Sequence, residues 1–235
     1  MALSITEAKV TSGVDNVDSS AASFASNPAA GNLIVVSING WRSGVFNMST
    51  TGVTDNQGNT YTRIIQSTNQ GSGTASIFYA YNVASSGTFT ITVDPDSTGN
   101  YLSWVAYNIS GATTADPLDK SATDNGVGLS ATSGSTGTLS QANEFVTASM
   151  TKNGANANVV EVTVPLWITD AQIDSNAVHQ PTMINSKIVG ATTALAANWT
   201  IAGSEAWTAV IATFKEGAGG AASTFIPKMT LLGVG

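Results

Sequence analysis

The sequence contains no cysteine and only one histidine, His179, among its 235 residues. Without cysteine the chain can form no disulfide, thiol nucleophile or thiolate metal site. A zinc site or a Ser-His-Asp triad would have to use His179, but the sequence has neither an H-E-x-x-H motif nor a G-x-S-x-G motif. Since His179 precedes Gln180 and Pro181, we interpret it as an exposed loop histidine.

Charged residues are also scarce, at 10% of the chain, and only eight are lysine or arginine against fifteen acidic residues. Affinity for nucleic acids depends on contacts with phosphates, and binding to anionic membranes also needs basic residues. We therefore expect neither a nucleic acid nor a membrane as a partner. Serine, threonine and asparagine replace the charges, which favours a neutral surface held against neighbouring subunits, or one outside the cell.

Targeting segments are missing from the sequence as well. Residues 1–9 have neither the basic start nor the apolar run of a signal peptide. No apolar run reaches the ~18 residues needed to span a bilayer. We expect a protein without a signal peptide or transmembrane segment, made in the cytoplasm and assembled afterwards.

The acidic residues show no catalytic pattern. Most lie in segments typical of turns, and only Glu144, Glu161 and Glu205 lie within or beside apolar runs. None of these forms a pair that indicates a glycosidase, and the phosphate-binding loop motif is absent. The sequence therefore predicts no catalytic residue, no enzymatic activity and no organic cofactor.

Calcium is the one ion for which the sequence offers ligands. Asp94, Asp96 and Asn100 place hard oxygen atoms on one tight turn. However, Pro95 fills the second position and no glutamate follows at the twelfth, so this is not an EF-hand loop. The alternative is that these side chains cap the turn.

The residues that are present favour strands. Short apolar runs and alternating segments recur between turns rich in Gly, Asn and Asp. They predict about twelve strands and very little helix, in an antiparallel all-β sandwich of the jelly-roll kind. The clearest runs are residues 32–39, 76–83, 88–93, 101–109, 145–150, 159–164, 183–189 and 206–214. The core is expected to contain Ile77, Tyr79, Phe89, Ile91, Trp104, Ile211 and Phe214.

We expect residues 1–216 to form a single domain. Segments 31–37, 76–83 and 102–106 resemble 142–148, 183–189 and 205–209 in the same order. Either the domain contains two similar strand sets, over about 1–111 and 139–216, or period-two alternation makes unrelated strands alike. The polar stretch 112–138 is expected to be a surface excursion.

The end of the sequence combines a flexible segment with an apolar one. Residues 217–224 read as a Gly/Ala linker, and residues 225–235 as an apolar C-terminal arm or last strand. Paired on its own domain, the segment would be an ordinary strand; paired on a neighbour, it would join subunits. The candidate subunit contacts are Phe225, Ile226, Met229, Leu231 and Leu232.

Two tryptophans are candidates for glycan contacts. Trp41 and Trp199 lie near predicted loops or strand ends, where an exposed ring could stack on a sugar. Trp104 and Trp207 lie in the middle of predicted strands and are expected in the core.

The segment from Asp55 to Thr62, DNQGNTYT, is the most specific part of a wider resemblance. The chain resembles, over about residues 28–216, a β-sandwich domain that recurs in phage virion proteins and in some bacterial surface proteins. The other matching segments are AGNLIVV at 30–36, IFYAYNV at 77–83, SG at 110–111 and PLD at 117–119. The resemblance implies a fold and a setting on a virion, and it carries no catalytic residues.

These observations leave two functions from different classes. The first is a non-enzymatic virion structural protein, a capsid decoration or other particle-surface subunit, whose partners are copies of itself and other virion proteins. The alternative is a carbohydrate-binding or adhesive module on a virion or cell surface, with surface glycans as its partners.

Overall fold

We describe a computed structural model of the chain, which covers residues 1–42, 46–68, 73–154, 159–161, 167–173 and 181–218. These residues form fourteen strands and no helix, and all the strand pairs are antiparallel. Within these ranges no helix has the length and apolar character to cross a membrane. The predicted all-β antiparallel fold is therefore confirmed, while a jelly-roll order of strands stays a prediction.

The strands form three sheets. The five-stranded sheet has the order β1 (Ser4–Val17), β8 (Asn100–Ser110), β3 (Leu33–Trp41), β6 (Gly73–Ala80) and β5 (Thr62–Thr68). The six-stranded sheet has the order β11 (Val159–Glu161), β14 (Asn198–Lys215), β10 (Glu144–Lys152), β13 (Thr182–Val189) and β12 (Ile168–Ile173), with β9 (Leu118–Thr132) also paired to β14. The three-stranded sheet has the order β2 (Ser20–Ser23), β7 (Thr90–Val93) and β4 (Val53–Asp55).

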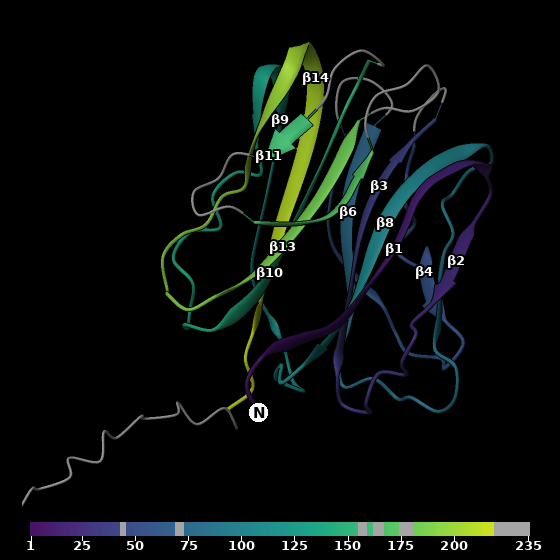
Figure 1. Cartoon of the computed structure of the whole chain (residues 1–235), viewed down its shortest axis with the longest axis vertical. Coiled ribbons are helices and arrows are strands. Elements are labelled where there is room, and N and C mark those ends of the chain that lie inside the picture. Colours follow the sequence, from purple (N-terminus) through teal and green to yellow (C-terminus); the bar gives the residue numbers. More distant parts are fainter. Residues whose placement is uncertain (43–45, 69–72, 155–158, 162–166, 174–180, 219–235) are drawn as a thin grey trace, which may run out of the picture.

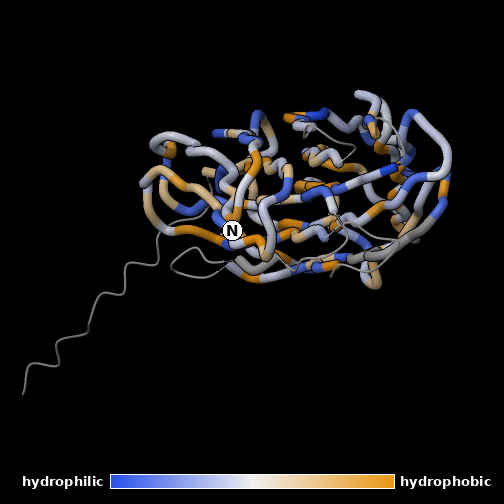
Figure 2. Tube along the Cα trace, turned by 90° about the horizontal axis from the view of Figure 1, so that it is seen from above, coloured by the Kyte–Doolittle hydropathy of each residue, from blue (hydrophilic) through white to orange (hydrophobic). Residues whose placement is uncertain are grey.

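The sheets stack in three layers, with the five-stranded sheet in the middle (Figure 1). One apolar cluster, which includes Phe78 and Phe89, fills the space between this sheet and the three-stranded one. A second cluster, which includes Tyr107 and Phe145, fills the space between the five- and six-stranded sheets. A third cluster, around Trp199, covers the other face of the six-stranded sheet. Seen from above, hydrophobic stretches run through the interior between these layers (Figure 2).

Strands of the middle layer are buried on both faces, so one-sided alternation does not describe β6. Ile77 belongs to the cluster on one side of the five-stranded sheet, and Phe78 to the cluster on the other. Beyond the strand, Val83 belongs to the cluster on the side opposite that of Ile77. β6 ends at Ala80, and Asn82, with a positive φ of 49°, breaks the alternation.

The two larger sheets repeat the same order of strands along the chain. The order β1-β8-β3-β6-β5 corresponds to β9-β14-β10-β13-β12. The three segments of the first half that resemble segments of the second half occupy equivalent places, as β3 and β10, β6 and β13, β8 and β14. Backbone hydrogen bonds from Ser133 to Ala197 (2.9 Å) and from Thr136 to Leu195 (2.9 Å) form a counterpart to the β2–β7 pair.

The expectation of a surface excursion over residues 112–138 is wrong. Residues 118–132 form β9, which pairs with β14 along most of its length. The second strand set therefore starts at about residue 118 rather than 139. The sequence of β9 is polar because this strand is at the edge of its sheet, where backbone hydrogen bonds rather than buried side chains hold it.

The predicted core is confirmed at six of its seven positions. Tyr79 is half-buried, with its ring centroid 5.7 Å from that of Phe214. The buried six are Ile77, Phe89, Ile91, Trp104, Ile211 and Phe214.

The DNQGN turn after β4 is held by its own side chains. Gly58 has a φ of 80°, a conformation that glycine adopts without strain. Asp55 Oδ1 accepts hydrogen bonds from the backbone N–H of Gln57 (2.9 Å) and Asn59 (3.1 Å). Its Oδ2 accepts from Asn59 Nδ2 (2.9 Å) and from the Tyr61 hydroxyl (3.0 Å). The most specific segment of the sequence thus has a structural role.

Phe89→Ala tests the packing between the three- and five-stranded sheets. The Phe89 ring is fully buried, with its centroid 6.0 Å from that of Phe24. We expect a loss of about 3–5 kcal/mol in the free energy of unfolding, because the variant leaves a cavity. Chemical denaturation measures this loss. Ile168→Ala, at an exposed position of β12, should change stability by no more than about 0.5 kcal/mol. Equal effects of the two variants would contradict the assignment of Phe89 to the core.

Asp55→Ala tests the turn. The variant loses four hydrogen bonds to a carboxylate, and we expect a loss of roughly 2–4 kcal/mol in unfolding free energy. Asp55→Asn keeps one acceptor oxygen for the two backbone N–H groups and should lose less. Thermal and denaturant unfolding measure both variants. If Asp55→Ala were as stable as the native chain, Gly58 alone would determine the turn.

Candidate binding cleft

The interface between the two large sheets changes from apolar at its base to polar towards its top. Along β10, Phe145 lies in the apolar cluster, and Thr147, Ser149 and Thr151 follow on the same face. Along β3, Leu33 and Val35 are followed in the same way by Ser37 and Asn39. All of these side chains are buried. The upper half of the interface is therefore rich in hydroxyl and amide groups.

Hydrogen bonds cross this polar region and tie the sheets together. Ser37 Oγ and Thr147 Oγ1 lie 2.9 Å apart, and Thr208 Oγ1 donates to Ser67 Oγ at 2.6 Å. Nearer the edge, the Tyr107 hydroxyl donates to Asp170 Oδ2 at 2.8 Å. Burial is the main reason that the pKa of Tyr107 lies well above its usual value, so this hydroxyl keeps its proton.

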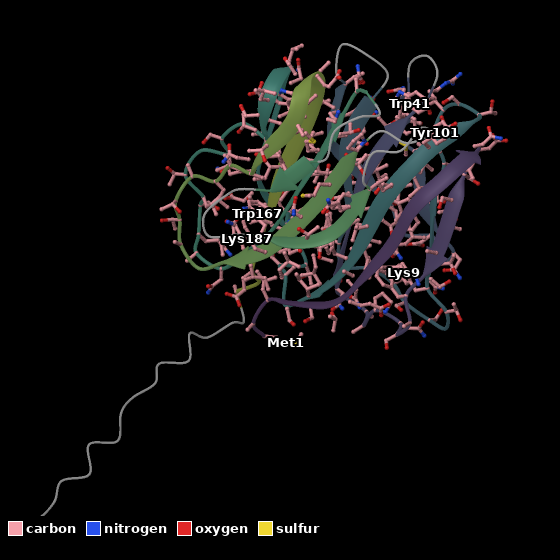
Figure 3. All side chains as sticks on the ribbon, turned by 45° about the horizontal axis from the view of Figure 1, so that its top comes forward. Met1, Lys9, Trp41, Tyr101, Trp167 and Lys187 are labelled. Carbon is pink, nitrogen blue, oxygen red and sulfur yellow. The ribbon has the colours of Figure 1, made fainter. Side chains whose placement is uncertain are left out.

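A small cleft lies at the upper end of this polar region, where β3 ends and β8 begins. Trp41 and Tyr101 are paired residues of these strands, and their ring centroids lie 4.8 Å apart with 42° between the planes. Both rings are half-buried and form the rim (Figure 3). We call this site the Trp41 cleft; it encloses about 10 Å³ and is lined by Asn39, Gly40, Trp41, Tyr101, Leu102, Ser103, Ile173 and Thr182.

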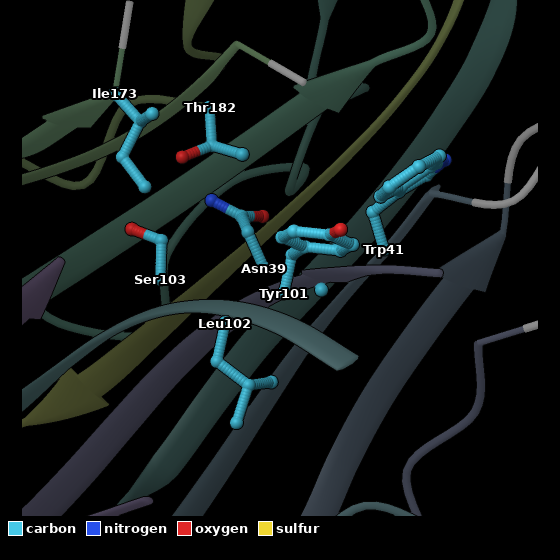
Figure 4. A pocket seen from close by; sticks show the side chains of 8 residues that line it. Asn39, Trp41, Tyr101, Leu102, Ser103, Ile173 and Thr182 are labelled. Atoms are coloured by element: carbon cyan, nitrogen blue, oxygen red, sulfur yellow. The ribbon is translucent and has the colours of Figure 1, made fainter. Parts of the chain in front are cut away.

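Behind the aromatic rim the cleft is lined by polar groups without partners. Asn39, Ser103 and Thr182 are 0%, 2% and 6% exposed. The Asn39 Oδ1, Ser103 Oγ and Thr182 Oγ1 atoms have no hydrogen-bond partner among the described residues. Figure 4 shows Asn39 between Tyr101 and Ser103, with Thr182 across from it. None of the described lining residues carries a charge, so they can bind a neutral polar group by hydrogen bonds.

Of the two tryptophans predicted to contact glycans, only Trp41 lies at this cleft. The expectation that Trp199 is exposed is wrong. Its side chain is fully buried in the third apolar cluster, and its indole N–H donates to Asn185 Oδ1 at 3.0 Å. Sequence reasoning placed Trp199 at a strand end, but the turns around residues 133–139 and 192–197 cover that face of the sheet. Trp167 is also buried, with Lys187 Nζ 4.3 Å from its ring centroid.

The side chains considered for calcium make separate contacts in the turn between β7 and β8. Asp96 Oδ2 accepts a hydrogen bond from Asn47 Nδ2 (2.7 Å), and Asn100 Oδ1 accepts from the Ser97 hydroxyl (2.8 Å). Asp94 is exposed. Across the described part of the chain, no group of three or more His, Cys, Asp or Glu residues is placed to hold a metal ion. Of these two contacts, only the one between Ser97 and Asn100 lies within the turn, while Asn47 belongs to a separate loop.

Some predicted residues cannot be placed. His179 and the five subunit-contact candidates Phe225, Ile226, Met229, Leu231 and Leu232 lie outside the described residues. The same holds for the whole of the predicted C-terminal arm.

Sequence reasoning gave no role to a buried carboxyl group at the start of β10. Glu144 is fully buried, with the side chains of Asp119 and Thr213 beside its carboxyl group. Burial is the main reason that the pKa of Glu144 rises to about 7, and nearby Asp119 raises it further. Burial alone would also raise the pKa of Asp119, but hydrogen bonds from Ser140 and Glu144, together with the charge of Lys120, lower that pKa. In the sequence Glu144 directly precedes the apolar run 145–150, and this pattern does not indicate that its carboxyl group is buried.

Comparison with known proteins adds no relative. No protein-family model matches the sequence, no curated protein matches it, and no solved structure matches the fold.

Glu144 should make the stability of the protein depend on pH. Because folding raises its pKa from 4.5 to about 7, the folded protein holds this proton more tightly than the unfolded chain. The stabilising effect is complete below pH 4.5 and is lost as the pH rises through 7. A shift of this size corresponds to at most about 3 kcal/mol.

Glu144→Gln removes the titrating group. The unfolding free energy of the variant should therefore not fall as the pH rises through 7, and the variant should be more stable than the native chain at pH 8. Denaturant unfolding between pH 4 and pH 8 measures the effect. Asp94→Asn, at an exposed carboxyl group, should keep the native pH profile. A native-like profile in Glu144→Gln would contradict the assignment.

Proposed function

We propose that this protein is a non-enzymatic structural subunit of a phage virion, a capsid decoration or other particle-surface subunit. Its partners are copies of itself and other virion proteins. The resemblance of residues 28–216 to a domain of phage virion proteins supports this setting. The observation that carries the proposal is the uncharged, apolar edge of the six-stranded sheet formed by the upper part of β9.

β9 provides a place for a further strand. Among the described residues it pairs with β14 alone, which leaves the other edge of the strand without a described partner. Val127 and Leu129 on β9 are 61% and 62% exposed, unusually high for large apolar side chains in a strand. An edge with exposed apolar side chains is a template for pairing with another chain.

The upper part of β9 lacks the features that normally prevent such pairing. Proteins protect edge strands with charged residues or proline. The charged residues of β9 are Asp119, Lys120 and Asp124, and residues 125–132 contain neither a charge nor a proline. This contrast within one strand favours association at its upper end.

We assign residues 225–235 of a neighbouring copy as the strand that covers this edge. This segment contains the subunit-contact candidates Phe225, Ile226, Met229, Leu231 and Leu232. Strand addition combines main-chain hydrogen bonds with burial of alternate side chains, and the exposed Val127 and Leu129 offer such a surface. The linker 217–224 would let the segment reach another subunit.

The test is the assembly state of the full chain, measured by light scattering and sedimentation. We expect the native chain to associate and the double variant Val127→Lys, Leu129→Lys to be a folded monomer. Both positions are exposed, so the two changes should alter the unfolding free energy by no more than about 1 kcal/mol in total. A monomeric native chain would contradict the proposal.

Two further variants test which residues make the subunit contact. Ile168→Lys, at a similarly exposed position on the edge strand β12, should leave association intact. A chain that ends at residue 223 should be as monomeric as the β9 variant. If that shortened chain still associated while the β9 variant did not, the edge would pair with a strand other than residues 225–235. If the shortened chain unfolded, the segment would be part of its own domain.

A further inference from the structure

We infer that the Trp41 cleft binds a neutral glycan, with one sugar hydroxyl inserted among Asn39, Ser103 and Thr182 and the sugar ring lying against the aromatic rim. This site is separate from the subunit contact proposed above, since the cleft lies at the ends of β3 and β8 and the contact on β9. The inference therefore does not depend on the proposed association.

The polar lining is the first reason. A buried polar group without a hydrogen bond is costly, and nearly all such groups in proteins have a partner. The cleft brings together three of them, Asn39 Oδ1, Ser103 Oγ and Thr182 Oγ1. They come from both large sheets and face one small space (Figure 4). Together they offer an acceptor and two hydroxyl groups, which can accept or donate, as a bound hydroxyl group requires.

The size of the cleft is the second reason. About 10 Å³ holds a single group of the size of a water molecule, so a sugar ring cannot enter. A ligand can place one hydroxyl inside only if the rest of it lies outside, against the rim. There Trp41 and Tyr101 present half-buried rings, whose apolar faces suit the C–H face of a sugar.

The absence of charge among the described lining residues indicates the ligand class. Phosphates and acidic sugars are bound through arginine, lysine or helix N-termini, and none of these is among the described residues that line the cleft. A neutral hexose matches the combination of aromatic rim, amide and hydroxyl groups.

The experiment is a titration of the full chain with D-glucose, D-galactose and D-mannose, each up to about 100 mM, a range that covers millimolar affinities. The readouts are tryptophan fluorescence and amide chemical shifts. We expect at least one hexose to give a saturable change. Trp41→Ala should weaken its binding about tenfold or more, and Trp41→Phe should weaken it less because an aromatic face remains.

Ser103→Ala separates binding from folding. The hydroxyl that it removes has no partner in the described part of the chain, so we expect the variant to fold like the native chain and to bind the hexose about three- to tenfold more weakly. Ser76→Ala is the matched control, because Ser76 Oγ is also buried and without a described partner but does not line the cleft. Tyr81→Ala removes an exposed ring elsewhere. Neither control should change the titration.

Each outcome is informative. The absence of a saturable change with all three hexoses would overturn the inference and leave a cleft that holds one structural water. Binding that persists in both Trp41→Ala and Ser103→Ala would also overturn it, since the sugar would then lie elsewhere. The β9 double variant should bind as the native chain does, so a failure of association and a failure of glycan binding are distinguishable.

Discussion

The face-to-face packing of the two large sheets is the constraint on which the rest of the structure depends. Their central strands, β3 and β10, are buried along nearly their whole length on both faces. A sheet buried on both faces needs a cover on each, and the three-stranded sheet and the turns at 133–139 and 192–197 supply the outer covers. The repeated strand order follows the same logic, because each half presents one large sheet to the other and covers its opposite face.

The interface between the two large sheets changes from apolar at its base to polar in its upper half. Its base is closed by apolar and aromatic side chains, including Phe145 and Phe214, whose ring centroids lie 6.1 Å apart. Its upper half contains hydroxyl and amide groups that must find partners across the gap, as Ser37 and Thr147 do. Hydrogen bonds have stricter geometry than apolar contacts, so the polar half fixes how the sheets align. At the Trp41 cleft, three buried polar atoms have no partner among the described residues.

The low charge of the chain acts differently in the two proposed sites. On β9 it leaves an edge without the charged side chains that would repel another strand. In the Trp41 cleft it leaves a polar lining that has hydrogen-bonding capacity but no preference for ions. Glu144, whose carboxyl group has a pKa raised by burial, lies at neither site, and its effect is on the stability of the fold. The two sites therefore differ in chemistry. The site on β9 is a strand edge with exposed apolar side chains, and the Trp41 cleft is a recess lined by hydroxyl and amide groups beneath two aromatic rings.

The sequence by itself determined the fold class, most of the core and the DNQGN turn. These depend on local signals: period-two alternation, turn residues, and a carboxylate within reach of the next few N–H groups. It also indicated Trp41 as a surface aromatic. Only the tertiary structure decided that β9 is a strand, since backbone pairing leaves little trace in side chains. The burial of Trp199 and Glu144 was likewise visible only in the tertiary structure, because burial depends on which distant segments cover a face of the sheet. For the same reason, no sequence pattern could bring Asn39, Ser103 and Thr182 together: they lie on different strands, and only the packing of one sheet against the other makes them neighbours.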